Sequence, residues 1–259
     1  MSIAARPAAS AVPPVPAGDP GGLEGDLEVP SSWSPLVIVV LAHDAAEASA
    51  VVAPVWEASW QMVATPATGR RGADLKRAFG EGLRRGGQCL VAWPGELSDW
   101  RALVPRLLRP IFAQRAEIVL AEYTPEACEN GLRPLPASSA RRLFGYPHAF
   151  VPQGPLAVTR RALDLIPFEA NADGPLFEHQ LLAQARHFGV EVAPVTLPPE
   201  AYRTMADRRG GRGSAGGLGE ILCDLERIAH RWGLVESPRF HAPQATSLSR
   251  WVITNDKTR

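Results

Sequence analysis

The sequence has little cysteine and no net charge, and both absences exclude whole classes of protein. The three cysteines, Cys89, Cys128 and Cys223, are an odd and scattered set. They argue against a disulfide framework and against a cysteine-rich zinc site, and they fit a reducing cytoplasm. Basic and acidic residues balance at 27 each, so no overall field attracts nucleic acid or an anionic membrane.

No apolar run is long enough to cross a bilayer. The most apolar stretch, Leu36–Ala42, has the length of a strand and falls far short of a membrane span. The first residues also lack the basic-then-apolar order of a signal peptide. We therefore expect a soluble, cytoplasmic protein that binds no nucleic acid and has no transmembrane segment.

The composition divides the chain into three parts. Residues 1–34 are rich in Ala, Pro and Gly and have almost no large apolar side chains, so they cannot offset the entropy of ordering and are expected to form a disordered leader. Residues 35–235 are expected to form one α/β domain. Residues 236–259 show no periodicity and are expected to be a disordered or loosely packed tail.

Strands and helices alternate through the first half of the domain. The predicted strands are residues 36–41, 61–65, 88–93 and 116–123, and the predicted helices are residues 45–59, 72–86 and 98–114. The first strand is a continuous β-branched run without alternation, which is typical of a strand covered on both faces. The order β-α-β-α-β-α-β predicts a mainly parallel, Rossmann-like sheet with helices on both faces.

The second half begins after a Pro- and Arg-rich connection. Residues 149–168 are predicted to be an extended stretch that leads into a short helix, followed by a helix at 176–189 and a strand at 190–198. Glycine and arginine dominate residues 203–217, for which we expect a flexible loop. A last helix is predicted at 220–232.

Several stretches, in this order, resemble the family-two nucleotide-sugar glycosyltransferases, which have the GT-A fold. They are GRRGADLKRAFGEGL, LVAWPGELSDWRALVPRLLRPIFAQRAEIVLAEY, FVPQGPLAVTRRALDLIPF and GPLFEHQLLAQARHFGVEVAPVTL. Within this family the chain is most similar to the glucosyl-phosphoglycerate and mannosylglycerate synthase branch, over roughly residues 37–203. The resemblance implies a nucleotide-sugar donor and a small acceptor that is phosphorylated or carboxylated.

The chain departs from this family at the metal site. The family's Asp-x-Asp, whose two carboxylates hold Mg²⁺ or Mn²⁺ against the donor diphosphate, corresponds to Pro94-Gly95-Glu96. Glu96, with Asp99 one turn on, would make a rebuilt metal site; otherwise Glu96 is an acidic residue that favours the following helix dipole.

Two further parts of the family pattern are missing. The family's later metal-binding His falls at about Tyr202, which does not replace an imidazole. Residues 41–69 also leave room for one helix and one short strand only, so a βα unit that holds the base and ribose in the family is absent or remodelled.

The resemblance implies donor contacts for two pairs of residues. Arg70 and Arg71 would hold the diphosphate, because guanidinium groups suit phosphate and a helix N-terminus lies beside them. The alternative for this pair is a solvated helix start. His43 and Asp44 follow the first strand, at the edge where ligands bind in open α/β sheets.

On the acceptor side, the resemblance implies that Glu178 is the catalytic base or orients the acceptor hydroxyl. The alternative is a polar shoulder of the helix, shared with His179. Acceptor contacts are implied for Gly154, Arg203, Arg208, Arg209 and Arg212. The arginines would bind an acceptor phosphate from a mobile loop, whereas the plainer interpretation is a solvated loop.

Three functions remain open from the sequence. The first is a bacterial-type glycosyltransferase with an altered metal site. The second is a catalytically inactive relative that acts as a binding or regulatory module, which the three departures favour. A nucleotidyltransferase-like enzyme is less consistent, because the first strand is not followed by a glycine-rich loop. The sequence leaves a homodimer open.

Overall fold

The computed structural model describes residues 31–42, 60–95, 97, 100–122, 154–174, 176–209 and 227. The tail, the predicted helix at 45–59 and the connection at 124–145 lie outside the described residues. The leader does so as well, apart from its last four residues. Of the helix predicted at 220–232, only Arg227 is described, and it is helical.

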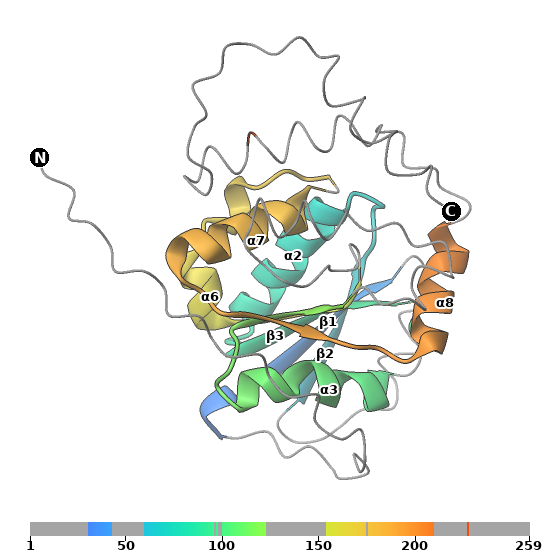
Figure 1. The fold of residues 1–259 in the computed structure, drawn as a ribbon, viewed down its shortest axis with the longest axis horizontal. Coiled ribbons are helices and arrows are strands. Elements are labelled where there is room, and N and C mark those ends of the chain that lie inside the picture. Colours follow the sequence, from blue (N-terminus) through green and yellow to red (C-terminus); the bar gives the residue numbers. More distant parts are fainter. Residues whose placement is uncertain are drawn as a thin grey trace, which may run out of the picture.

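The described strands form one six-stranded sheet in the order β2-β1-β3-β5-β4-β6 (Figure 1). They are β1 (Leu36–Ala42), β2 (Trp60–Pro66), β3 (Cys89–Pro94), β4 (Ile118–Ala121), β5 (Leu156–Thr159) and β6 (Val192–Val195). β1 is parallel to β2 and β3, and β4 is parallel to β6. β5 lies between β3 and β4 and is antiparallel to both. The mostly parallel α/β sheet is confirmed.

Helices cover both faces of this sheet (Figure 1). The helical elements are η1 (Ser31–Trp33), α2 (Arg71–Arg84), α3 (Trp100–Phe112), α6 (Arg160–Leu165), η2 (Phe168–Ala170), α7 (Phe177–Phe188) and α8 (Pro199–Arg209). α2, α6 and α7 pack on one face, and α3 and α8 on the other. The short helix η1 falls within the expected leader, where the Trp33 ring stacks on that of Phe112.

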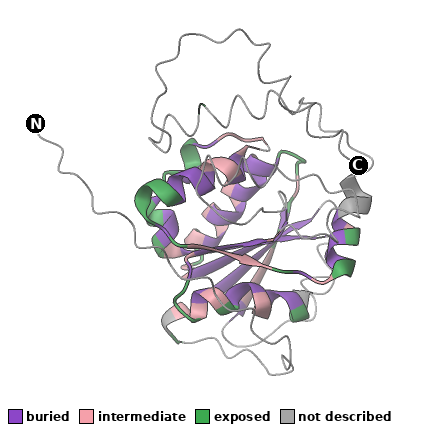
Figure 2. Ribbon diagram, viewed as in Figure 1, coloured by how far each residue is buried: buried purple, intermediate pink, exposed green. Residues whose placement is uncertain are grey.

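Successive side chains of β1 point to opposite faces of the sheet, and all of them are apolar, which explains why the sheet has helices on both sides. Ile38 and Val40 join the core under α3 and α8, whereas Val37 and Val39 join the core under α2 and α7. All seven residues of β1 are buried, which is visible in the purple centre of Figure 2. A strand without a polar side is stable only between two helical layers.

The region predicted as a loop from residue 203 is helical up to residue 209, so this prediction was wrong for its first part. Pro199 begins α8, a position where proline is tolerated because its missing N–H would have no helical partner. Ala201, Tyr202 and Met205 are buried in the core beneath α3. Three apolar positions on one helix face outweigh the polar character of the neighbouring sequence.

The parallel strands end at one edge of the sheet, the carboxyl edge. From β1 the chain continues to β2 on one side, and from β3 it continues to β4 on the other, so neighbouring strands send their connections in opposite directions. In open α/β sheets such a switch point opens a crevice where ligands bind. This switch point lies outside the ends of β1 and β3, at Ala42 and Pro94.

Candidate functional site

The start of α2 at the carboxyl edge is built around the buried carboxylate of Asp74. It accepts hydrogen bonds from the Thr68 backbone N–H at 3.0 and 3.1 Å and from the Thr68 hydroxyl at 2.6 Å. Arg77 donates to the same carboxylate at 2.5 Å. Gly69 between them has a φ of 77°, a conformation that favours glycine. The carboxylate thereby fixes the turn that presents Arg70 and Arg71.

Arg71, Glu178 and Gly154 meet at this edge, although they come from distant segments of the chain. Arg71 Nε donates to Glu178 Oε1 at 2.9 Å, and Arg71 Nη2 donates to the Gly154 carbonyl oxygen at 2.5 Å. The side chains of Arg71 and Glu178 are only 9% and 4% exposed. The ion pair joins the first turns of α2 and α7, and the hydrogen bond joins both to Gly154, two residues before β5. A phosphate contact by Arg71 would require the pair to open.

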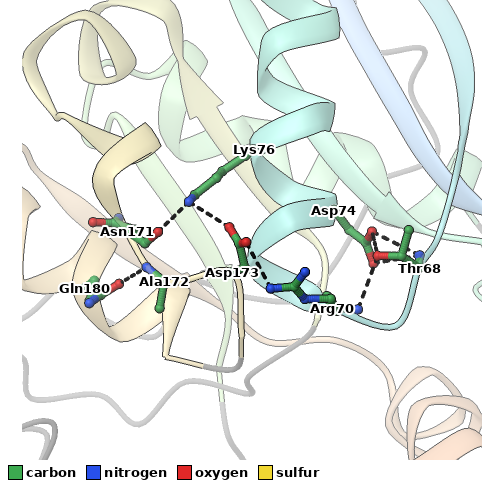
Figure 3. A network of polar contacts seen from close by, with 8 residues as sticks. All are labelled: Thr68, Arg70, Asp74, Lys76, Asn171, Ala172, Asp173 and Gln180. Carbon is green, nitrogen blue, oxygen red and sulfur yellow. Dashed lines mark hydrogen bonds and ion pairs between the residues drawn. The ribbon is translucent and has the colours of Figure 1, made fainter.

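Arg70 lies beside this pair but points to solvent, with a side chain that is 68% exposed. Its Nη2 forms an ion pair with Asp173 Oδ2 at 3.0 Å, and Lys76 Nζ pairs with Asp173 Oδ1 at 2.9 Å (Figure 3). Lys76 also donates to the Asn171 carbonyl oxygen. The hydrogen bond and charge of Lys76, followed by the charge of Arg70, lower the pKa of Asp173 below its usual value. The Asp173 carboxylate is therefore ionised at neutral pH.

The segment 171–174 is held against α2 and α7 by hydrogen bonds. The Ala73 N–H donates to the Asp173 carbonyl oxygen at 3.0 Å, and the Ala172 N–H donates to Gln180 Oε1 at 2.5 Å (Figure 3). Asn171 Nδ2 donates to Gln184 Oε1 at 2.9 Å. The predictions from sequence missed Lys76 and Asp173, because their proximity depends on how this segment crosses α2.

The predicted metal ligands Glu96 and Asp99 lie outside the described residues, as do the predicted donor contacts His43 and Asp44. Among the residues that the structure describes, no group of three His, Cys, Asp or Glu side chains is arranged to hold a metal ion. The metal site predicted at Glu96 and Asp99 stays a prediction.

Tyr202, at about the position to which the sequence resemblance assigned a metal-binding His, is fully buried. Its hydroxyl donates to the Glu122 carbonyl oxygen at 2.7 Å and accepts from the Leu197 N–H at 3.1 Å. The side chain thus ties α8 to the ends of β4 and β6, which is a structural role.

Of the predicted acceptor arginines, Arg203 is an exposed residue of α8, on the opposite sheet face from α2 and α7. Arg208 and Arg209 are the last two residues of α8, and their side chains are not described; Arg212 lies outside the described residues. Gly154 and Glu178 are thus both bound to Arg71, whereas Arg203 lies on the other face of the sheet.

The fold and this site define an α/β protein with a mostly parallel sheet and a charged cluster at its carboxyl edge. No family model matches the sequence, and no curated protein is similar to it. Among solved structures, glucosyl-3-phosphoglycerate synthase from Mycobacterium tuberculosis, in complex with Mg²⁺ and uridine diphosphate, matches at 18% identity and a TM-score of 0.38. The match covers 71% of this chain and 83% of that one. Similarity of this size assigns neither family nor function.

In the described part of the chain, no helix combines the length and the apolar character that crossing a bilayer requires.

Proposed function

We propose that this chain is a glycosyltransferase-like protein that binds a nucleotide-sugar donor at the carboxyl edge, outside the ends of β1 and β3. The observation that carries the proposal is the meeting of Arg71 with Glu178 and Gly154. The sequence resemblance assigned Arg71 to the donor side and the other two residues to the acceptor side. Their positions are 107 and 83 residues from Arg71, and they converge beside the switch point.

The proposed reaction transfers the sugar to a hydroxyl group of a small acceptor that carries a phosphate or carboxylate. A bond forms between the acceptor oxygen and the anomeric carbon, and the bond from that carbon to the diphosphate oxygen breaks. Glu178 takes the hydroxyl proton, and Arg71 holds the Glu178 carboxylate in place. The exposed Arg70 guanidinium stabilises the charge that develops on the departing diphosphate.

A second candidate function is an inactive glycosyltransferase relative that binds the donor without transferring the sugar. The state of Glu178 favours it: the carboxylate is buried and bound to a guanidinium, and a base must reach the acceptor hydroxyl. The missing Asp-x-Asp pair points in the same direction.

Donor binding is tested first, by thermal shift with UDP-, GDP- and ADP-linked sugars in Mg²⁺, Mn²⁺ or EDTA. A donor at a hundredfold excess over its dissociation constant stabilises the fold by about 2.7 kcal/mol, which is readily measured. We expect one donor class to raise the melting temperature, and Arg70→Ala to reduce this rise. Arg84→Ala is the matched control, because Arg84 is a 72% exposed arginine at the other end of α2. A melting temperature that no donor changes would refute the proposal.

Transfer is tested separately, by acceptor-dependent release of the nucleoside diphosphate. Release that Glu178→Gln abolishes, while donor binding is retained, supports the enzyme. Donor binding without release for any phosphorylated or carboxylated acceptor supports the inactive relative.

A further inference from the structure

The Asp173 carboxylate occupies a cationic site at the carboxyl edge. It bridges Arg70 and Lys76 with one oxygen on each, and it remains 41% exposed itself. The neighbouring acid Asp74 does not neutralise this site, because its carboxylate is bound to Thr68 and Arg77. The site thus has two cations and a single anion, which is a side chain of the protein.

The carboxylate is not needed to hold its own segment in place. Backbone groups of residues 172 and 173 bond to Gln180 and to the Ala73 N–H, and the Asn171 side chain bonds to Gln184. The packing is also close, since a Cβ atom on Gly72 would lie 2.1 Å from the Ala172 carbonyl oxygen. The Asp173 side chain can therefore rotate away while the backbone stays.

A terminal phosphate, as in a nucleoside diphosphate or inorganic diphosphate, satisfies the same two cations better than a carboxylate does. It offers three acceptor oxygens and a charge nearer to −2, and both guanidinium and ammonium groups bind phosphates strongly. The ion pairs that Asp173 makes are solvent-exposed, and exposed pairs of this kind contribute little stability each. A diphosphate can displace the carboxylate at small cost.

We propose that Asp173 is an internal competitor for the diphosphate of the ligand: its carboxylate occupies Arg70 and Lys76 in the empty protein and leaves them when a diphosphate binds. The inference rests on the proposed function for the identity of the bound molecule, a nucleoside diphosphate. It adds Lys76 as a phosphate contact and makes Asp173 the residue that sets the affinity of the site.

The test measures binding of inorganic diphosphate and of UDP, GDP and ADP to the Asp173→Asn variant by calorimetry. Removal of the competing carboxylate is expected to tighten diphosphate binding by about threefold to tenfold. Arg70 and Lys76 are then free for the ligand at all times, whereas in the wild type Asp173 occupies them part of the time. Asp173→Ser is the second variant, in case the amide forms new contacts. Melting temperatures of both variants report whether the fold is kept.

Asp164→Asn is the matched control. Asp164 is 63% exposed and pairs with Arg160, but it lies on α6, which follows β5 at the opposite edge of the sheet. This variant changes the net charge equally, so a general electrostatic effect would appear in both. In the Lys76→Gln background, the gain from Asp173→Asn is expected to shrink, which a purely structural role of Asp173 would not produce.

Two results would overturn the inference. The first is that Asp173→Asn binds inorganic diphosphate no more tightly than Asp164→Asn does. The second is that no variant binds inorganic diphosphate. The proposed function fails independently. If inorganic diphosphate responds to Asp173→Asn but no nucleotide or nucleotide sugar binds, the anion site stands and the glycosyltransferase assignment falls. If a nucleotide sugar binds and Asp173→Asn leaves its affinity unchanged, the function stands and the competitor role falls.

Discussion

At the scale of single residues, the buried ion pair between Arg71 and Glu178 is the main result. The sequence predicted a diphosphate contact for the first residue and acceptor chemistry for the second, and these roles remain predictions. The structure adds that the two side chains form an ion pair with each other and that both are buried. Charges buried in this way are costly unless they stay paired, so the pair constrains both side chains whatever ligand is bound.

We predict that Arg71→Met strongly destabilises the fold. The Glu178 carboxylate would stay buried without its guanidinium, which typically lowers the free energy of unfolding by about 3 kcal/mol or more. The double variant Arg71→Met/Glu178→Leu should recover part of this loss, because no charge is then buried. Urea unfolding followed by tryptophan fluorescence measures both. For the exposed control Arg84→Met we expect a loss below about 1 kcal/mol; an equal loss in Arg71→Met would contradict the prediction.

At the scale of secondary-structure elements, the position of α2 is set by how closely its first turn approaches the segment 171–174. Glycine at position 72 permits this approach, and the Ala73 N–H bonds to the Asp173 carbonyl oxygen across it. Two turns further along the same face of α2, the Phe79 ring makes an edge contact with that of Phe168 at 5.5 Å between centroids. The site geometry therefore depends on a small residue at one position.

A pair of glycine substitutions in α2 tests this dependence. In Gly72→Ala the new methyl group would meet backbone atoms of Ala172 and Asp173 at 2.1 to 2.8 Å, so we expect a loss of about 1–3 kcal/mol. In Gly80→Ala the methyl group meets nothing within 4 Å, and we expect a gain of about 0.5–1 kcal/mol from helix propensity. The urea midpoint of each variant is compared with that of the wild type. If both midpoints shift in the same direction, the close approach at Gly72 is not maintained.

At the scale of the whole molecule, the two helical layers seal the sheet from solvent. Cys89 begins β3 at the centre of the sheet and is completely buried. Burial raises the pKa of the Cys89 thiol far above its usual value, because the thiolate would lose its hydration. The folded protein therefore keeps this proton at alkaline pH values at which an unfolded chain has lost it.

The global stability is predicted to fall in alkaline solution through Cys89. The unfolded chain releases the thiol proton above about pH 8.5, whereas the folded chain retains it. The stabilisation is therefore complete below that pH and is lost as pH rises, at up to about 1.4 kcal/mol per pH unit. Unfolding free energies at pH 8, 9 and 10 should decline more steeply in the wild type than in Cys89→Ala. Parallel declines would contradict this assignment.

Much of the fold was predictable from local patterns. The continuous apolar runs of β1 and β3 predicted buried strands, and the spacing of Leu75, Phe79 and Leu83 predicted α2. These patterns predict secondary structure because the free energy gained by burying a side chain depends on that residue's own apolar surface. The loop prediction at 203–209 failed because the polar residues Arg203 and Thr204 concealed the buried Met205, which continues the buried face formed by Ala201 and Tyr202.

The sequence by itself determined most of the described strands and helices, although not α8, because hydrophobic periodicity is a local property of the chain. Only the tertiary structure decided that β5 inserts antiparallel between β3 and β4, since backbone hydrogen bonds between strands do not depend on side-chain identity. The same holds for the site. Arg71 and Glu178 were each singled out from the sequence, and their roles stay predictions. Their ion pair was not predicted, because the partner of a buried charge is chosen by the packing of distant elements.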